Sequence, residues 1–398
     1  MRKTEELIKE SEKWGAYNYH PIPIVIESGK GVWVEDVEGE KYMDMLSAYS
    51  AVNQGHRHPK IVDALVEQAN KMPLTSRAFH NDMMGKFLKK LCETTGFEKA
   101  LPMNTGAEAV ETALKAARKW GYEKKKVEPN KAEIVACKNN FAGRTISIIT
   151  FSTEEQYRDG FGPFTPGFKT IEYGNAKALE EVVTENTVAI ILEPIQGEGG
   201  IIVPPEGYLK EVRKITKDNN VLMIVDEIQT GFGRTGKLFA FEHEGIKPDI
   251  VCVGKALSGG LYPVSAMLSS KEVMNVFRPG DHGSTFGGNP IGSAVAIAAI
   301  DVLLEEKLVE RAAELGTYLI EELNKIDAPC IKEVRGKGLL IGVEIKKEYG
   351  GARRYCEKLM DEGILCKETH QQIIRLAPPL IVLREELDWA IGKFRKVL

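Results

Sequence analysis

Residues 221–229 read VLMIVDEIQ and residues 249–255 read DIVCVGK, and these two stretches decide the fold. Each contains a short, unbroken apolar run, which is typical of a strand that is covered on both faces of a parallel sheet. Two such strands at this distance along the chain suit a crossover unit with parallel strands. Ligands of open α/β sheets collect beyond the carboxyl ends of the strands. We therefore expect Asp226 and Lys255, which follow the two runs, to face one crevice.

A lysine and an acid in such a crevice point to a particular cofactor. A lysine at the rim of an apolar strand is partly desolvated, which disfavours its charged form and makes its amine a better nucleophile. Pyridoxal phosphate (PLP) is held by such a lysine, with an acid on the pyridine nitrogen. The alternative is that Lys255 extends to solvent and Asp226 caps the next helix. Each residue alone favours that alternative, whereas the pair, with the Gly- and Thr-containing stretches below, favours PLP.

Several long motifs carry a resemblance to a known family. VDEIQTGFGRTG at 225–236 and GKALSGGLYPVSA at 254–266 resemble the class III, subgroup II aminotransferases. Three further stretches are similar to the members of this family that act on ornithine: NYHPIP at 18–23, SAYSAVNQGHRHP at 47–59 and LTSRAFHN at 74–81. The similarity covers almost the whole chain. It implies the α/β architecture of fold-type I PLP enzymes, a mostly parallel central sheet with helices on both faces and a smaller α+β C-terminal domain.

The expected organisation has three parts. Residues 1–48 form an N-terminal arm and hairpin, residues 49–290 a large PLP-binding domain, and residues 291–398 a small C-terminal domain. The hairpin is predicted from alternating residues on both sides of a glycine-containing turn at 36–40. An Ala-rich helical stretch at 291–304 is expected to continue toward 325, and residues 334–344 are expected to form a strand.

Composition is that of an ordinary globular protein. The chain has 398 residues, 43% hydrophobic and 28% charged, which is long enough for two or three domains. A net charge of −4 shows no basic excess, so no nucleic-acid partner is expected. The six cysteines form no CxxC pair, which argues against a zinc site or a disulfide framework. With no signal-peptide core and no membrane-spanning apolar stretch, we expect a cytoplasmic protein without a membrane partner.

The helix predicted from Gly106 to about Trp120 begins after Asn104 and Thr105. These residues can serve only as caps, or the free N–H groups can bind a phosphate. The resemblance favours the phosphate and implies roles toward PLP for seven residues. These are Gly106 and Ala107 as phosphate donors, Phe141 against the ring, Asp226 at the ring nitrogen, Gln229 at the ring hydroxyl, Lys255 as carrier and proton shuttle, and Thr285 at the phosphate of the neighbouring subunit. Thr285 thereby implies a homodimer with shared sites.

The resemblance also implies substrate contacts. Arg144 would hold the α-carboxylate of ornithine and then the distal carboxylate of 2-oxoglutarate, which its planar fork suits. Tyr19 would meet the spare α-amine of ornithine, with Tyr49 nearby. Glu198 would select between the substrates by pairing with Arg375, which needs an anionic partner if it is buried.

Some residues near these positions keep open interpretations. Glu193 and Glu198 both follow a predicted strand at 188–192, where carboxylates are more often turn residues at a solvated strand end. No His or Cys cluster supports a metal site. His282, beside the loop of Thr285, has no assigned role. Ala142 departs from relatives that carry a bulky aromatic residue or His at this position.

The implied activity is transfer of the terminal amine of ornithine to 2-oxoglutarate through PLP. A related ω-aminotransferase that acts on acetylornithine or 4-aminobutyrate would keep every cofactor residue, although Tyr19 and the 47–59 stretch disfavour it. A PLP amino-acid racemase would also keep Lys255. A non-catalytic binding protein on the same scaffold is the alternative outside enzymology, and the retained Lys255 and Asp226 oppose it.

Overall fold

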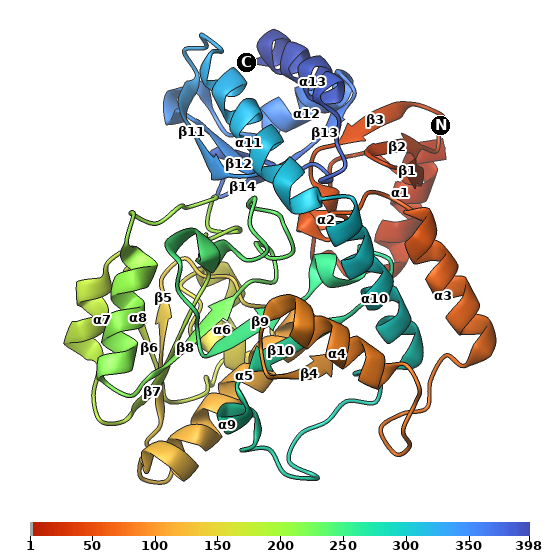
Figure 1. The fold of residues 1–398 in the computed structure, drawn as a ribbon. Helices are drawn as coiled ribbons and strands as arrows, with labels where there is room; N and C mark the ends of the chain where they lie inside the picture. Colours follow the sequence, from red (N-terminus) through yellow and green to blue (C-terminus); the bar gives the residue numbers. More distant parts are fainter. Residues whose placement is uncertain (1–2) are drawn as a thin grey trace.

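A seven-stranded sheet lies at the centre of the protein, whose computed structural model describes residues 3–398 (Figure 1). Its strands, in spatial order, are β4 (Lys99–Met103), β10 (Ser265–Ser269), β9 (Ile250–Val253), β8 (Leu222–Asp226), β7 (Thr187–Leu192), β5 (Glu133–Cys137) and β6 (Phe168–Ile171). The five strands from β9 to β6 run parallel, and β10 is antiparallel to both of its neighbours. The predicted parallel pairing of the two opening strands, and the mostly parallel sheet, are confirmed.

Both faces of this sheet are buried, because successive side chains of each strand enter different cores. Along β8, Met223 joins one core and Ile224 the other. The second core contains the long apolar face of α5 (Gly106–Trp120), with α6 (Ile146–Thr150) and α9 (Lys271–Met274). The first core contains α7 (Ala176–Val182) and α8 (Tyr208–Asp218). The expectation of helices on both faces is confirmed.

The N-terminal strands form a second sheet that a distant strand completes. The order is β1 (Ile26–Lys30), β2 (Trp33–Asp36), β3 (Lys41–Asp44) and β13 (Ile364–Leu365), and β13 runs parallel to β3. The predicted hairpin is β2 and β3, which are antiparallel. The helices of this part of the chain are α1 (Lys3–Trp14), the short turn α2 (Ser47–Ser50), α3 (Pro59–Lys71) and α4 (Met84–Thr95). Both α3 and α4 pack on α10 (Pro290–Glu305), and α4 also packs on β4 of the central sheet. The N-terminal arm therefore lies against the C-terminal elements (Figure 1).

The C-terminal part differs from expectation at two points. The helical stretch after residue 290 is two helices, α10 (Pro290–Glu305) and α11 (Leu308–Asn324), because Lys307 has a left-handed backbone with φ of 53°. Residues 334–344 do not form one strand. They contribute to β11 (Ile331–Lys337) and β12 (Leu340–Ile345), an antiparallel pair that turns at Gly338, where φ is also 53°.

These strands belong to a third sheet with the order β11, β12, β15 (Ile373–Leu376) and β14 (Lys367–Thr369). Two more helices accompany it, α12 (Arg353–Asp361) and α13 (Arg384–Val397). Single helical turns complete the described chain: Gly121–Lys125, Glu155–Tyr157, Ala240–Glu244, Lys255–Ser258 and Lys347–Tyr349. No helix within residues 3–398 is long and apolar enough to cross a membrane.

Candidate active site

The ends of β8 and β9 open into a cavity of about 200 Å³. Asp226 is the last residue of β8 and lies opposite Cys252 of β9. Lys255 follows β9 by two residues. The cavity is lined by residues of five chain segments: Gly106, Ala107, Phe141, Ala142, Gly143, Glu193, Glu198, Asp226, Ile228, Gln229, Thr230 and Lys255. The prediction that Asp226 and Lys255 face one crevice is therefore confirmed.

Lys255 is held in an unusual local conformation. Its φ is 46°, in the left-handed region that non-glycine residues rarely adopt. Such backbone strain persists only where the surrounding structure enforces it, and it concentrates at functional sites. The amine donates no hydrogen bond to any residue from 3 to 398. Burial lowers the pKa of Lys255 from its ordinary value. A buried amine that is less readily protonated is suited to act as a nucleophile.

Two buried carboxyl groups lie on the other side of the cavity. Asp226 accepts a hydrogen bond from the backbone N of Ile228 at 3.0 Å, and burial raises its pKa to about 6. Glu193 accepts from the backbone N of Phe141 at 3.0 Å and of Gly197 at 3.1 Å. Burial and the nearby charge of Asp226 raise the pKa of Glu193 to about 8. Glu193 is therefore a buried acid, and its interpretation as a turn residue at a solvated strand end is wrong.

The first turn of α5 forms the anion-binding end of the cavity. Thr105 caps the helix in a capping box with Glu108, whose backbone N donates to Thr105 Oγ1 at 3.2 Å. The backbone N–H groups of Gly106 and Ala107 have no acceptor within residues 3–398. A side chain at Gly106 would meet Ile228 Cδ1 at 3.0 Å, so a small residue is needed there. Free N–H groups at a helix N-terminus suit a phosphate.

Gln229, Phe141 and Ile228 also line the cavity. Gln229 Nε2 donates to Glu198 Oε1 at 3.3 Å, while Gln229 Oε1 is buried and has no partner within the described chain. Phe141 and Ile228 supply apolar surface to the cavity. An amine, a buried acid, a bare amide oxygen, an apolar wall and free helix N–H groups together match the functional groups of PLP. The residues present therefore fit this cofactor.

Thr285 does not line the cavity of its own chain. It is exposed, on the loop between α9 and α10. The loop is tied back to the start of α5, because Ser284 Oγ accepts a hydrogen bond from Asn104 Nδ2 at 2.8 Å. His282, in the same loop, contacts Thr112 Oγ1 at 2.8 Å and Lys115 Nζ at 3.0 Å.

Glu198, which lines the cavity, forms an ion pair with Arg375. Arg375 of β15 is 1% exposed, and its Nη1 donates to Glu198 Oε1. Burial opposes ionisation of Glu198, but the charges of Arg375 and Lys255 outweigh it and hold the pKa below its usual value. Arg375 also lies over the ring of Tyr49, 4.6 Å from its centroid. The anionic partner that the sequence required for a buried Arg375 is Glu198.

Arg144 does not line the cavity, although the preceding Gly143 does. It is exposed, and its guanidinium stacks on Tyr157 at 3.7 Å and lies 5.7 Å from the centroid of Phe141. Tyr157 was not among the residues predicted from the sequence. It also borders, with Glu198, a larger opening of about 820 Å³. Sequence reasoning missed Tyr157 because residues 155–157 form an isolated turn that no recognisable motif surrounds.

Tyr19 and Tyr49 share a neighbouring cavity of about 370 Å³. Tyr49 belongs to a run of four residues with positive φ, Ser47 to Ser50, so α2 is a left-handed turn. Asp44 Oδ1 accepts from the backbone N of Leu46 and of Ser47, both at 2.8 Å, which holds the start of this turn. Tyr19 is 68% exposed and lies in the irregular segment before β1.

Comparisons with known proteins agree with this geometry. A family model described as aminotransferase class-III matches residues 14–398. An ornithine aminotransferase of Brevibacillus brevis is 59% identical over 398 residues, covering 100% of this chain and 99% of that protein.

Two solved structures have the same fold. That of the ornithine aminotransferase of Toxoplasma gondii, with PLP at partial occupancy in its active site, has a TM-score of 0.98 at 45% identity, covering 99% of this chain and 94% of that chain. An acetylornithine aminotransferase from Elizabethkingia anophelis has a TM-score of 0.91 at 50% identity, covering 100% and 99%.

The raised pKa of Asp226 generates a prediction for the protein freed of cofactor. The folded state holds this proton up to about pH 6, whereas an unfolded Asp releases it near pH 3.9. Stability from this group is therefore lost as pH rises through that window. Asp226→Asn removes the titration. The decrease in the free energy of unfolding from pH 4.5 to pH 7.5 should be about 1–3 kcal/mol smaller for Asp226→Asn than for the unsubstituted protein. Urea unfolding at both pH values measures the difference.

The matched control is Asp218→Asn at the exposed end of α8. Its pH profile should run parallel to that of the unsubstituted protein. A parallel profile for Asp226→Asn as well would contradict the prediction.

Proposed function

The chain belongs to the class III aminotransferase family, and from that membership we propose that it is an ornithine δ-aminotransferase that uses PLP. It transfers the terminal amine of L-ornithine to 2-oxoglutarate, with L-glutamate 5-semialdehyde and L-glutamate as products. The observation that carries the proposal is the 59% identity to an ornithine aminotransferase over the whole of both chains. The cavity at the ends of β8 and β9 supports it, because its side chains match the cofactor group by group.

Bound PLP supplies an aldehyde that accepts an amine and a ring that takes up the electrons left on the substrate carbon when its proton departs. Lys255 would hold the cofactor through its amine, and as a free amine it would act as the base that moves the proton at the substrate carbon. Asp226 holds a proton at the ring nitrogen. Gln229 Oε1, which is buried and unpartnered within the described residues, accepts a hydrogen bond from the ring hydroxyl.

The remaining cofactor contacts fix its orientation. The N–H groups of Gly106 and Ala107 donate to the phosphate at the N-terminus of α5. Phe141 packs on the ring, and its backbone N is held by buried Glu193. Burial, which is the larger cause, and the nearby charge of Asp226 together raise the pKa of Glu193 to about 8. A protonated Glu193 avoids a second negative charge beside Asp226.

Two unlike substrates must use one pocket. Ornithine presents its terminal amine, with the α-carboxylate held by Arg144 and the spare α-amine by Tyr19. Glutamate and 2-oxoglutarate react beside a carboxylate and place it on Arg375, with the distal carboxylate on Arg144. Glu198 neutralises Arg375 in the structure, and this supports binding of ornithine, which places no carboxylate there. Glu198 moves away when a substrate carboxylate takes its place.

Acetylornithine aminotransferase is the second candidate, since one such structure is 50% identical over the whole chain. The cofactor residues serve both activities equally. The two donors differ at the α-amine, which is charged in ornithine and an uncharged amide in acetylornithine. Tyr19, beside Tyr49 at the same cavity, favours the free amine.

We also propose that the protein is a homodimer with shared sites. Thr285 is exposed and lies outside its own cavity, although its loop is anchored beside the phosphate end of α5. This exposed position supports a contact between Thr285 and the cofactor phosphate of a second copy. Large exposed aromatic residues supply apolar surface for such an interface: Trp14, Tyr17, Phe79 and Phe286.

An amine-donor panel with 2-oxoglutarate tests the activity. Ornithine should have the highest kcat/KM, and acetylornithine and 4-aminobutyrate should be lower by about 100-fold or more, because a site built for a polar group rejects an analogue without it. Glutamate formation is the readout, and Lys255→Ala should form none with any donor. Preference for acetylornithine would overturn the proposal. Loss of optical rotation without amine transfer would reveal a racemase, and absence of a PLP absorbance band would reveal a non-catalytic protein.

Glu198→Ala should change which amine donor reacts faster. Without Glu198, Arg375 is free to bind a substrate carboxylate. The rate of the glutamate half-reaction relative to the ornithine half-reaction should therefore rise by about 10- to 100-fold, which corresponds to the free energy of one charge-assisted hydrogen bond. Single-turnover absorbance changes of bound PLP measure each half. Arg375→Ala should chiefly slow the 2-oxoglutarate half. Equal slowing of both donors by Glu198→Ala would show that Glu198 has a structural role only.

Mixing two inactive variants tests the shared sites. In a hybrid of Lys255→Ala and Thr285→Asp subunits, one site keeps its own Lys255 and takes Thr285 from the partner. An equal mixture allowed to exchange subunits should therefore regain about a quarter of the unsubstituted activity in a two-fold dimer. Full activity of a monomer at high dilution, or no recovery after exchange, would count against shared sites.

A further inference from the structure

The segment that carries Tyr19 has little structure of its own. Residues 15–24 lie between α1 and β1 and form neither helix nor strand. The backbone N of Gly15 donates to Ser11 O of α1 at 2.8 Å, and the other backbone hydrogen bonds are local turns, Asn18 N to Ala16 O at 2.9 Å and Ile24 N to Ile22 O at 2.7 Å. Pro21 and Pro23 have no N–H to donate. The direction of Tyr19 must therefore be set by contacts from elsewhere in the chain.

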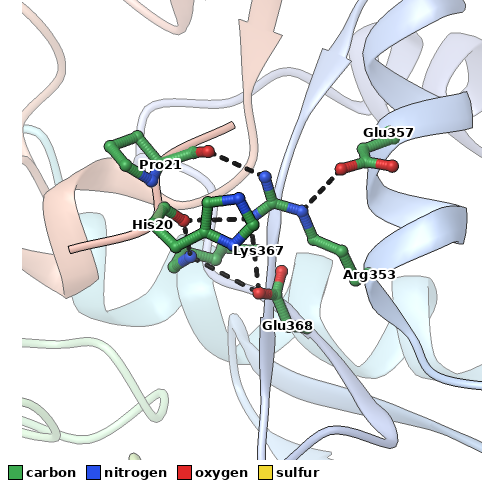
Figure 2. Close-up of polar contacts among 6 residues, drawn as sticks. All are labelled: His20, Pro21, Arg353, Glu357, Lys367 and Glu368. Carbon is green, nitrogen blue, oxygen red and sulfur yellow. Dashed lines mark hydrogen bonds and ion pairs between the residues drawn. The ribbon is translucent and has the colours of Figure 1, made fainter. Parts of the chain in front are cut away.

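Those contacts come from the C-terminal part of the protein (Figure 2). Arg353 of α12 donates from Nη2 to Pro21 O at 2.7 Å and from Nη1 to His20 O at 3.1 Å. Lys367 Nζ approaches His20 O at 3.4 Å. Within residues 3–398 no other side chain outside the segment is hydrogen-bonded to residues 15–24. Partly buried Ile22 supplies the apolar contact.

Arg353 is itself held in place. Its Nε donates to Glu357 Oε1 at 2.7 Å, one turn further along α12. Its Nη1 lies 3.4 Å from Glu368 Oε1 of β14. The side chain of Arg353 is 22% exposed, so water has little access to compete for its hydrogen bonds. A planar guanidinium fixed by two acids is suited to hold two successive carbonyl groups, which a single ammonium is not.

The two carbonyl groups that Arg353 binds belong to the residues that directly follow Tyr19, the proposed contact with ornithine. Tyr19 immediately precedes His20, and its ring lines the same cavity as Tyr49, over which Arg375 lies. We propose that Arg353 is a positioning residue for ornithine, which aims Tyr19 at the spare α-amine by fixing the carbonyls of His20 and Pro21. The inference rests on the proposed function and on the assigned contact of Tyr19. Glutamate has no spare amine, so its half-reaction does not depend on Arg353.

The test uses the PLP-loaded enzyme and compares three variants. Arg353→Ala should raise KM for ornithine roughly tenfold, the loss of one or two hydrogen bonds from a charged donor, and leave kcat and the glutamate half-reaction within about twofold. Arg353→Lys should lie between Arg353→Ala and the unsubstituted enzyme. Arg354→Ala is the matched control, because it removes the same charge from the next residue, which contacts Tyr355 and not the Tyr19 segment.

A double-mutant cycle shows whether Arg353 acts through Tyr19. Tyr19→Phe should weaken ornithine binding, and adding Arg353→Ala to it should cost little more. Hydrogen exchange gives a readout that does not depend on turnover. Amides of residues 15–24 should exchange faster in Arg353→Ala and at the unsubstituted rate in Arg354→Ala.

Three outcomes would overturn the inference. They are equal effects on the ornithine and glutamate halves, full additivity with Tyr19→Phe, and faster exchange of residues 15–24 without a change in KM for ornithine. An unsubstituted enzyme that turns over glutamate but not ornithine would instead overturn the proposed function, and the inference with it.

Discussion

Burial of charged groups at the carboxyl ends of β7, β8 and β9 is the constraint on which the rest of the site depends. Desolvation penalises the charged form of each group, so Lys255 loses its proton more readily, and Asp226 and Glu193 keep theirs to higher pH. Backbone N–H donors reduce the penalty for both acids, at Ile228, Phe141 and Gly197. The amine of Lys255 alone is left without a hydrogen bond within the described chain, which is what a covalent carrier of a cofactor requires.

The burial of charged groups also links the C-terminal sheet to the central one. Arg375 of β15 is almost completely buried, so its charge needs a partner, and Glu198 on the loop after β7 supplies it across the two sheets. The pair also gives the pocket a charge that can be switched, because a substrate carboxylate is an equivalent partner for Arg375. The N-terminal arm completes the enclosure. It pairs β3 with β13 and is held at His20 and Pro21 by Arg353, so the substrate side is built from both ends of the chain.

The departures from the sequence-based expectations have a common origin. Residues 334–344 look like one apolar strand, but Gly336 and Gly338 permit positive φ, and the chain reverses there to pair β11 with β12. Residues 291–325 have a continuous helical pattern, but a left-handed Lys307 divides them. Glu193 resembles a solvated turn residue until the loops after β5 and β7 cover it. In each case the local pattern permits two conformations, and contacts distant in sequence select one.

What the sequence by itself determined is the framework of the cofactor site. This framework consists of local patterns with local physical causes: two apolar runs, one ending in Asp226 and one just before Lys255, and a capped helix that begins at Gly106. Parallel pairing of the two strands brings their carboxyl ends to one edge of the sheet. The charge of Arg375 predicted an anionic partner, and the family resemblance indicated Glu198 as that partner, which the structure pairs with it. The tertiary structure alone decided that Tyr157 stacks on Arg144 and that Arg353 holds the segment of Tyr19. These contacts join residues far apart in sequence or on irregular segments, where no periodicity records which side chains meet.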